Sequence, residues 1–366
     1  MIKAKRDELL APLSAVSGII ERRHTLPILS NVLIDGSGET LSFLATDIEI
    51  QISARTSLSS GRDAKSLTVG ARKLLDILRA LPEDTEINLQ PQDKRILVKA
   101  GRSRFTLQTL PAEDFPKLAK ATGEAIKFTL PQKALRRLLG LVQYAMAQQD
   151  IRYYLNGLLM VVDAGELKLV ATDGHRLAFA SMPVQAGTAR QEAIVPRKTV
   201  VELTKLLADT DEEVRIELSA SQAGFMFGTI QLVSKLIDGK FPDYTRVIPV
   251  QHKNKLQAQR EPLRQALQRA AILSNEKFRG VRWVLTDGSL KIVSSNADQE
   301  EAQEEVEVKY SGDALDIGFN VNYLLDVLNN VPGNELECAF GDSSSSALIS
   351  YASEKGFKYV VMPMRI

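Results

Sequence analysis

The chain has 366 residues, of which 44% are hydrophobic and 25% are charged, and its formal net charge is +1. This composition is typical of folded globular proteins, and the length accommodates two or three domains. The apolar runs are of strand length and fall short of the roughly 20 residues that a membrane-spanning helix needs. One cysteine, Cys338, excludes an internal disulfide framework, and three scattered histidines argue against a zinc site. Because the charged N-terminus lacks the apolar core of a signal peptide, we expect a cytoplasmic protein.

The first part of the chain contains a succession of elements that begins with an amphipathic helix at 5–22. Two apolar segments then flank a turn at Gly36 within 31–47, which predicts a β-hairpin whose turn residue has positive φ. A second amphipathic helix follows at 69–82, and the segment 101–118 supplies a closing strand. Helices and hairpins in this order indicate an α+β domain.

The same succession occurs twice more. The second copy has helices at 130–149 and 195–208, a hairpin at 156–173 that turns at Gly165, and a closing segment at 226–244. The third copy has helices at 261–280 and 319–332, a hairpin at 280–296 that turns at Gly288, and a last strand at the chain end. Such repetition predicts three related α+β domains, each with two helices packed on antiparallel sheet, at 1–122, 128–244 and 246–366. The alternative is a single irregular large domain.

Positive charge is concentrated in the helical segments. Five of the six predicted helices carry a net positive charge, whereas the rest of the chain is net acidic. A basic helical surface on an acidic body suits a polyanion, and lysine and arginine neutralise phosphates without identifying bases. This pattern favours sequence-independent binding of nucleic acid. The alternative is that these are ordinary solvated helix faces.

The sequence contains no recognised catalytic or nucleotide-binding motif. The phosphate-binding loop, the dinucleotide fingerprint, the zinc-protease helix and the nucleophile elbow are all missing from it. The one candidate is a possible triad of Asp173, His175 and Ser181, which would make the protein a hydrolase or a nucleic-acid-modifying enzyme. The first repeat has Asp47 but no histidine at the matching place, so Asp173 is more simply a turn residue after a buried strand. We therefore expect a protein that is not an enzyme and uses no cofactor.

Several long stretches resemble the beta subunit of bacterial DNA polymerase III, the beta sliding clamp family. They are RHTLPILSN (23–31), QDIRYYLNG (149–157), ATDGHRLA (171–178), SKLIDGKFPDY (234–244), AILSNEKFRGVR (271–282), FNVNYLLDVL (319–328) and YVVMPMRI (359–366). The resemblance runs from end to end. It implies a head-to-tail homodimer ring whose helices surround duplex DNA. It also implies partners that bind through short peptide motifs: the polymerase catalytic subunit, an ATP-driven clamp loader, and other replication and repair proteins.

Opposite ends of the chain carry complementary side chains. In the first repeat, Arg102 and Arg104 lie on one face of a strand, and Phe105 and Leu107 lie on the other. The third repeat offers a run of glutamates and an apolar pair. The resemblance assigns these segments to the subunit interface, with the residues Lys73, Arg102, Arg104, Phe105, Leu107, Ile272, Leu273, Glu300, Glu301 and Glu304. The alternative for the acidic run is an edge strand whose charges prevent aggregation.

The resemblance also implies a pocket for leucine or phenylalanine side chains of partner peptides, where the second and third repeats meet. Its expected residues are Leu155, Thr172, Gly174, His175, Arg176, Leu177, Pro242, Arg246, Val247, Asn320, Tyr323, Ser346, Val360, Met362, Pro363, Met364 and Arg365. Without the resemblance, Met362 to Met364 would be interpreted as the end of a core strand, and His175 as a core residue with satisfied hydrogen bonds. The sequence departs from the family at Ser343 to Ser346, where such clamps can carry an apolar residue, so we expect a more polar rim.

For DNA, the matching positions are Arg23, Arg72, Gln149, Tyr153, Tyr154 and Lys198. Tyrosine can contact the sugar-phosphate backbone or stack on an unpaired base. One of the two tyrosines could instead pack beneath the following strand. A further alternative is a DNA-binding protein with basic helices that does not close into a ring.

Overall fold

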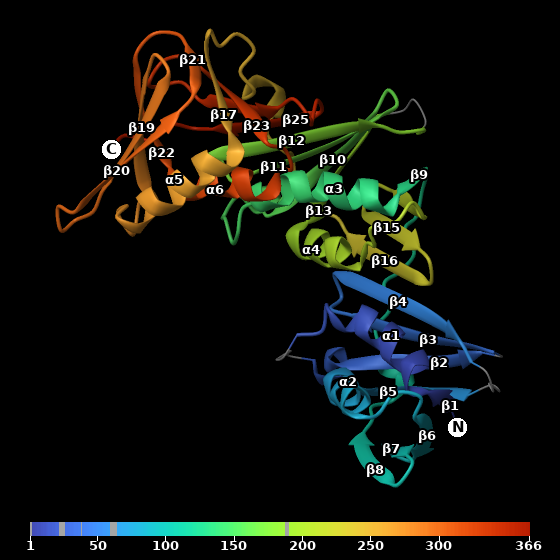
Figure 1. Cartoon of the computed structure of the whole chain (residues 1–366). Coiled ribbons are helices and arrows are strands. Elements are labelled where there is room, and N and C mark those ends of the chain that lie inside the picture. The colour runs from blue at the N-terminus through green and yellow to red at the C-terminus, as the bar shows by residue number, and fades with distance from the viewer. Residues whose placement is uncertain (1, 22–25, 38, 59–63, 187–189) are drawn as a thin grey trace. The chain divides into compact units, whose positions relative to one another are not determined.

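The computed structural model describes residues 2–21, 26–37, 39–58, 64–186 and 190–366. The chain divides into two compact units, one of residues 1–133 and 201–236, the other of residues 134–200 and 237–366 (Figure 1). Each unit contains one large and one four-stranded antiparallel sheet. The central repeat is divided between the two units, because the chain crosses from one to the other at the start and in the middle of that repeat.

The first unit contains an eight-stranded sheet in the order β5-β2-β3-β4-β16-β15-β14-β9 and a four-stranded sheet in the order β1-β6-β7-β8. Its strands are β1 (Ile2–Lys5), β2 (Asn31–Ser37), β3 (Thr40–Thr46), β4 (Ile50–Ser57), β5 (Ala64–Gly70), β6 (Glu86–Gln92), β7 (Arg95–Ala100), β8 (Ser103–Gln108), β9 (Ile126–Pro131), β14 (Glu213–Leu218), β15 (Gln222–Phe227) and β16 (Ile230–Lys235). Helices α1 (Arg6–Ser17) and α2 (Ala71–Ala80) pack against each other. Leu9, Leu13 and Val16 of α1 are fully buried, and each such side chain contributes about 1.5–3 kcal/mol of hydrophobic stabilisation.

The second unit contains a nine-stranded sheet in the order β13-β10-β11-β12-β25-β24-β23-β17-β21 and a four-stranded sheet in the order β20-β19-β18-β22. Its strands are β10 (Gly157–Asp163), β11 (Glu166–Thr172), β12 (Arg176–Pro183), β13 (Gln191–Pro196), β17 (Asn254–Gln259), β18 (Gly280–Thr286), β19 (Ser289–Ser295), β20 (Glu301–Glu307), β21 (Lys309–Ser311), β22 (Leu315–Asn320), β23 (Glu335–Phe340), β24 (Ala347–Tyr351) and β25 (Phe357–Val361). The remaining helices of the chain are α3 (Gln132–Val142), α4 (Arg197–Leu206), α5 (Arg260–Ile272) and α6 (Val321–Asn330).

All three predicted hairpins form, as β2–β3, β10–β11 and β18–β19. Gly165 and Gly288 turn with φ of 78° and 73°, as predicted. The prediction for Gly36 was wrong, because Gly36 lies inside β2 opposite Leu41, and the strand continues to Ser37.

All six predicted helices form, but the first helix of each repeat ends earlier than its apolar period suggested. Helix α1 ends at Ser17, whose hydroxyl donates to the carbonyl of Leu13 at 2.6 Å, and α5 ends at Ile272. Beyond α5, the side chain of Asn275 accepts hydrogen bonds from the backbone N–H groups of Lys277 and Phe278. Short polar side chains that bond to nearby backbone in this way offer the chain an alternative to helix.

Neighbouring repeats are joined by antiparallel pairing of strands. In the first unit, β4 of the first repeat pairs with β16 of the second. In the second unit, β12 of the second repeat pairs with β25 of the third. In each junction, the strand from the earlier repeat (β4 or β12) directly follows that repeat's hairpin. The strand from the later repeat (β16 or β25) is the closing strand of that repeat. The large sheet of each unit is therefore continuous across a repeat boundary.

No helix in the described part of the chain combines the length and apolar character that a membrane crossing requires.

Candidate functional site

A pocket of about 460 Å³ opens in the second unit beside the β12–β25 junction. It is lined by Arg152, Tyr154, Leu155, Thr172, Gly174, His175, Arg176, Leu177, Phe241, Pro242, Tyr244, Arg246, Val247, Ser346, Val360 and Met362. Its floor is apolar, because Leu155, Leu177 and Val360 belong to a buried cluster that also includes Phe241. An apolar pocket of this size with a few polar groups at its edge is suited to binding one or two apolar side chains of a ligand.

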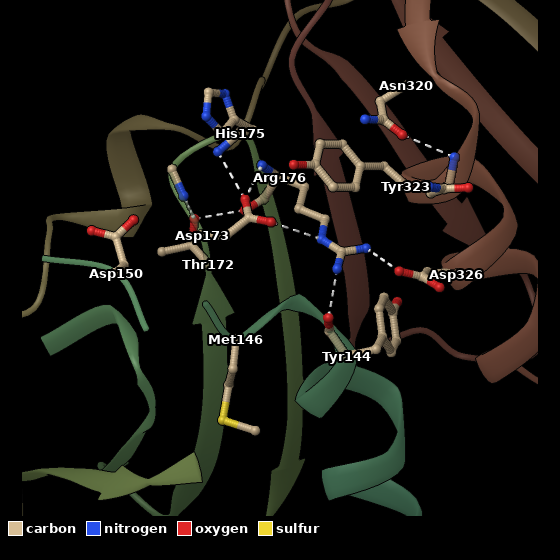
Figure 2. Close-up of polar contacts among 12 residues, drawn as sticks. Tyr144, Met146, Asp150, Thr172, Asp173, His175, Arg176, Asn320, Tyr323 and Asp326 are labelled. Carbon is tan, nitrogen blue, oxygen red and sulfur yellow. Dashed lines mark hydrogen bonds and ion pairs between the residues drawn. The ribbon is translucent and has the colours of Figure 1, made fainter. Parts of the chain in front are cut away.

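Arg176, at the start of β12, is the centre of a polar network in one wall of the pocket (Figure 2). Its guanidinium donates to Asp173 Oδ2 at 3.1 Å, to Asp326 Oδ2 of α6 at 2.5 Å and to the carbonyl of Tyr144 at 2.7 Å. The guanidinium carbon also lies 4.5 Å from the ring centroid of Tyr323, within cation–π range. One buried cation therefore ties the second repeat to a helix of the third.

Three tyrosines around this cation remain neutral. Burial raises the pKa of the Tyr144, Tyr323 and Tyr359 hydroxyls above the ordinary value. The Tyr359 hydroxyl donates to the carbonyl of Tyr323 at 2.9 Å. Burial is the largest single influence on the pKa of Arg176 and lowers it, but the neighbouring groups, among them the Asp326 carboxylate, raise that pKa by more in total, so the guanidinium keeps its charge. The network is thus a fixed, charged support and not a proton-transfer site.

We expect Arg176→Ala to lower the free energy of unfolding by about 3 kcal/mol, because it leaves partly buried carboxylates without their cation. Urea denaturation monitored by circular dichroism measures the change. The control is Arg246→Ala, since the Arg246 side chain is 86% exposed and its ion pair with Asp243 is on the surface. Equal unfolding midpoints for the two variants would contradict a structural role for the Arg176 network.

The loop at Arg152 also contributes to the pocket lining. The Arg152 guanidinium makes two hydrogen bonds to Asp150, at 3.0 and 2.8 Å, and one to the carbonyl of Asp173 at 3.1 Å. It covers Gly174, whose φ is +89° and where a Cβ atom would lie 2.8 Å from the guanidinium. Hydrogen bonds from Arg152 hold the pKa of Asp150 at about 2. Position 174 therefore favours glycine for its backbone conformation, and a side chain there would also displace the Arg152 guanidinium.

The geometry gives no support to the alternative in which Asp173, His175 and Ser181 form a catalytic triad. The Asp173 carboxylate accepts hydrogen bonds from Arg176 and from the backbone N–H of His175, and the His175 ring points away from it (Figure 2). Ser181 lies further along β12, where its backbone N–H donates to Gly356. In the described part of the chain, no three His, Cys, Asp or Glu side chains gather into a metal-binding group.

The structure brings most of the expected pocket residues together, but not all of them. The expected residues outside the lining are Asn320, Tyr323, Pro363, Met364 and Arg365. Tyr323 lies behind Arg176, and Asn320 caps α6 by accepting the N–H of Asn322. The sequence analysis omitted Arg152, Phe241 and Tyr244, and it assigned Tyr154 to DNA although that side chain lines the pocket. Of these residues, Phe241 and Tyr244 lie in the stretch 234–244 that carries the family resemblance, which was the available signal for them.

The serine run at 343–346 contributes little to the pocket. The hydroxyls of Ser344 and Ser345 donate to Asp342 Oδ1, each at 2.8 Å, and these hydrogen bonds lower the pKa of Asp342 to about 2. Of the run, Ser346 alone is in the lining. Its carbonyl oxygen is 2.8 Å from Nε2 of His252. The expected polar rim is therefore confined to one residue.

The expected DNA-contacting residues lie in different parts of the chain. Arg23 is outside the described residues. Arg72, in the first unit, is exposed and donates to the carbonyl of Ile20 at 3.0 Å. In the second unit, Gln149 has a φ of 54° and the Tyr153 side chain is 58% exposed, in edge contact with Tyr154. Lys198 lies half-buried in the first turn of α4.

Several basic side chains on the helices are already paired with carboxylates. The pairs are Lys133–Asp211, Arg137–Glu354, Lys205–Glu202, Arg264–Glu261 and Arg269–Glu304. Surface pairs of this kind are weak and exchange readily for other anions. The helical positive charge found in the sequence is therefore partly compensated within the chain.

The expected interface residues lie on or near two strands that each end a four-stranded sheet, β8 and β20, except Lys73, which lies on α2. On β8, Phe105 and Leu107 are half-buried, whereas Arg104 is exposed, as are Arg102 before the strand and Lys73 on α2. Near β20, Ile272 is 75% exposed and Leu273 is half-buried. Glu301 is exposed, and Glu300 accepts a hydrogen bond from Asn296. Glu304 differs from expectation, because it faces α5 and pairs with Arg269 at 2.9 and 2.5 Å.

Comparison with known proteins identifies this architecture of repeated two-helix domains as that of DNA clamps. Models of the N-terminal, central and C-terminal domains of the DNA polymerase III beta subunit match residues 1–119, 129–243 and 245–365. The beta sliding clamp of Pseudomonas aeruginosa is 48% identical over 363 residues, which cover 99% of both chains, and that of Escherichia coli K12 is 47% identical over 362 residues, again 99% of both. A crystal structure of the P. aeruginosa DNA polymerase III beta subunit covers 100% of both chains with a TM-score of 0.97 and 48% identity. A P. aeruginosa clamp bound to griselimycin covers 100% of this chain and 99% of that one, with a TM-score of 0.96 and 48% identity. The chain therefore belongs to the DNA polymerase III beta subunit family, the beta sliding clamps.

Proposed function

We propose that two copies of the chain associate head to tail into a closed ring that encircles duplex DNA and tethers the replicative polymerase. The three domains would extend over 1–122, 128–244 and 246–366. In this proposal the protein is not an enzyme. It acts in the cytoplasm by raising the local concentration of polymerase at the primer end, as a tether does.

The topology of the strands carries this proposal. Each repeat has a strand that follows its hairpin (β4, β12 and β20) and a closing strand (β8, β16 and β25). Within the chain, β4 pairs with β16 and β12 pairs with β25. The two members left over, β8 and β20, each end a sheet. A third junction between β20 of one copy and β8 of another would repeat the same contact, and a heterologous contact of this kind closes a ring when the rotation permits.

The two internal junctions also imply a register for the third. The turns before β8 and β16 each contain a glycine with positive φ, Gly101 and Gly228. When these two glycines are aligned, Phe105 of β8 corresponds to Leu232 of β16. In the β4–β16 junction, Leu232 pairs with Ile52. The β3–β4 pair of the first repeat corresponds to the β19–β20 pair of the third, and when the two pairs are aligned, Ala302 of β20 occupies the position of Ile52 in β4.

Phe105 would then lie opposite Ala302 of the other copy. This register places half-buried side chains opposite each other, and it places the exposed Arg104 opposite the exposed Gln303, between Glu301 and Glu305. Charge and burial therefore agree with a register that was derived from topology alone.

We infer that the pocket binds short peptide motifs of the polymerase, of an ATP-driven clamp loader and of other replication and repair proteins. Its apolar floor suits leucine or phenylalanine side chains, and its fixed polar walls suit recognition of peptide backbone. The expected pocket residues that line it are Leu155, Thr172, Gly174, His175, Arg176, Leu177, Pro242, Arg246, Val247, Ser346, Val360 and Met362. Griselimycin is bound by the P. aeruginosa clamp, and we propose it as a practical probe of the pocket in this chain.

DNA would be held by weak phosphate contacts from the helices, without discrimination of bases. Arg23, Arg72, Gln149, Tyr153, Tyr154 and Lys198 remain the proposed contacts. Such binding weakens steeply with salt, because each neutralised phosphate releases counterions. A ring adds topological linkage, which does not depend on salt in the same way.

Retention on circular DNA tests the proposed function. Loaded by a clamp loader onto a nicked circle, the protein should remain bound through gel filtration in high salt, and it should dissociate when the circle is cut, because a ring slides off a free end. A DNA-binding protein without ring closure would behave alike on both molecules. Loss of a measurable catalytic activity in His175→Ala would instead favour the enzyme alternative.

A further inference from the structure

The C-terminal tail, residues 362–366, is fixed at two points in the second unit. The backbone N–H of Met362 donates to the carbonyl of His175 at 2.9 Å, and the N–H of Met364 donates to the carbonyl of Gly318 at 2.9 Å. Pro363 lies between them and has no N–H to donate. Met362 lines the pocket, whereas Met364 bridges to β22 outside it. Met362 is therefore held both by its own bond to His175 and, through Pro363, by an attachment two residues further along the chain.

Gly318 provides this attachment because it has no side chain. A Cβ atom at Gly318 would lie 2.5 Å from the backbone oxygen of Met364 and 2.7 Å from Cδ1 of Ile366. Contacts below 3.0 Å essentially never occur for real Cβ atoms, and the backbone oxygen cannot rotate away as a side chain can. The tail can reach β22 only where that strand has a glycine.

A second glycine of the same sheet offers a comparison. Gly280 of β18 pairs with Asn320, which lies two residues from Gly318 in β22, and Gly280 also faces the tail. A Cβ atom there would lie 3.2 Å from Cδ1 and Cγ1 of Ile366 and 3.7 Å from Sδ of Met364, which are flexible side-chain atoms. Substitution by alanine should therefore displace the tail at Gly318 and be accommodated at Gly280.

We propose that Gly318 is a positioning residue for the peptide pocket: it fixes the tail on β22 and so holds Met362 at the pocket wall, although Gly318 itself touches no ligand. This inference rests on the proposed peptide-binding function. It assigns an indirect role to Met364 and Arg365, which were expected to line the pocket.

Substitution at the two glycines tests the proposal. Gly318→Ala should weaken griselimycin binding about tenfold in isothermal titration calorimetry, the effect of losing a hydrogen bond that orders a contact residue, whereas Gly280→Ala should bind like the wild type. In Gly318→Ala, amide hydrogen exchange should accelerate at Met364 and Met362 while the amides of the paired strands keep their wild-type rates, whereas a general loss of stability would accelerate exchange throughout the unit. Unchanged affinity of a folded Gly318→Ala protein would overturn the proposal.

A deletion of residues 364–366 provides a test that adds no atoms to the sheet. It retains Met362 and Pro363 but removes the attachment to Gly318, so the same loss of affinity is expected, and wild-type affinity would again overturn the proposal. If the wild-type protein itself failed to bind griselimycin, the proposed pocket function would fail instead. The two failures are therefore distinguishable.

Discussion

The double substitution Ile272→Ala with Leu273→Ala is expected to convert the proposed dimer into a monomer. Ile272 at the end of α5 is 75% exposed, and Leu273 after it is half-buried, so both offer apolar surface next to β20. Truncation of two such anchors costs about 2 kcal/mol each when they are buried in an interface, which raises the dissociation constant roughly a thousandfold. Analytical sedimentation measures the outcome, as a mass near 40.4 kDa in place of twice that value.

The control is Ile151→Ala with Val250→Ala. These side chains are 96% and 91% exposed in the same unit, but they lie outside the proposed contact. This protein should sediment like the wild type. A dimer that persists in the Ile272→Ala, Leu273→Ala protein would refute the assignment of this surface.

Cross-linking examines the register of the same junction. In the alignment of repeats described above, Thr106 corresponds to Val233 and Glu301 corresponds to Gln51. Val233 pairs with Gln51 in the β4–β16 junction, so Thr106 should lie opposite Glu301 of the other copy. Thr106→Cys with Glu301→Cys should therefore form an intermolecular disulfide. Thr106→Cys with Gln303→Cys should not, because diagonal neighbours are separated by about 7–8 Å. The native Cys338 is buried and does not compete.

The elements of the fold were predictable because the apolar residues of its helices and strands follow clear patterns along the sequence. Apolar segments on either side of a short turn located the three hairpins, and helical spacing of apolar residues located the six helices. Helix ends were missed where side chains such as Ser17 and Asn275 bond to nearby backbone, which apolar spacing does not report. Gly36 was misplaced because a glycine inside a strand and a glycine at a turn look alike in sequence.

The pocket was predictable where its residues lie on the paired strands, and less so where it depends on loops. Arg152 lines the pocket because it reaches across to Gly174, a contact between segments separated in sequence. Tyr153 and Tyr154 are adjacent and chemically alike, yet the first is 58% exposed and the second lines the pocket. The orientation of Glu304, by contrast, could have been found from strand alternation, since it shares a face with Ala302 and Val306.

Deletion of residues 362–366 is expected to abolish griselimycin binding while leaving the proposed dimer intact. The deletion removes Met362 from the pocket lining together with the hydrogen bonds to His175 and Gly318. Loss of one wall of an apolar pocket together with its fixed backbone should lower affinity by more than about a hundredfold, as removal of hot-spot contacts does. Isothermal titration calorimetry measures the affinity, and sedimentation measures the dimer in the same samples.

Removal of Ile366 alone is the matched control, because it keeps Met362 in the lining and the Met364 bond to Gly318. This shorter deletion should retain most of the affinity. The proposed subunit contact lies on β8, on β20 and at the end of α5, and none of the deleted residues belongs to these elements. Loss of binding together with loss of the dimer would mean that the tail stabilises the whole unit. Retained binding after the full deletion would place the griselimycin site elsewhere, because the wall that Met362 forms would then be dispensable.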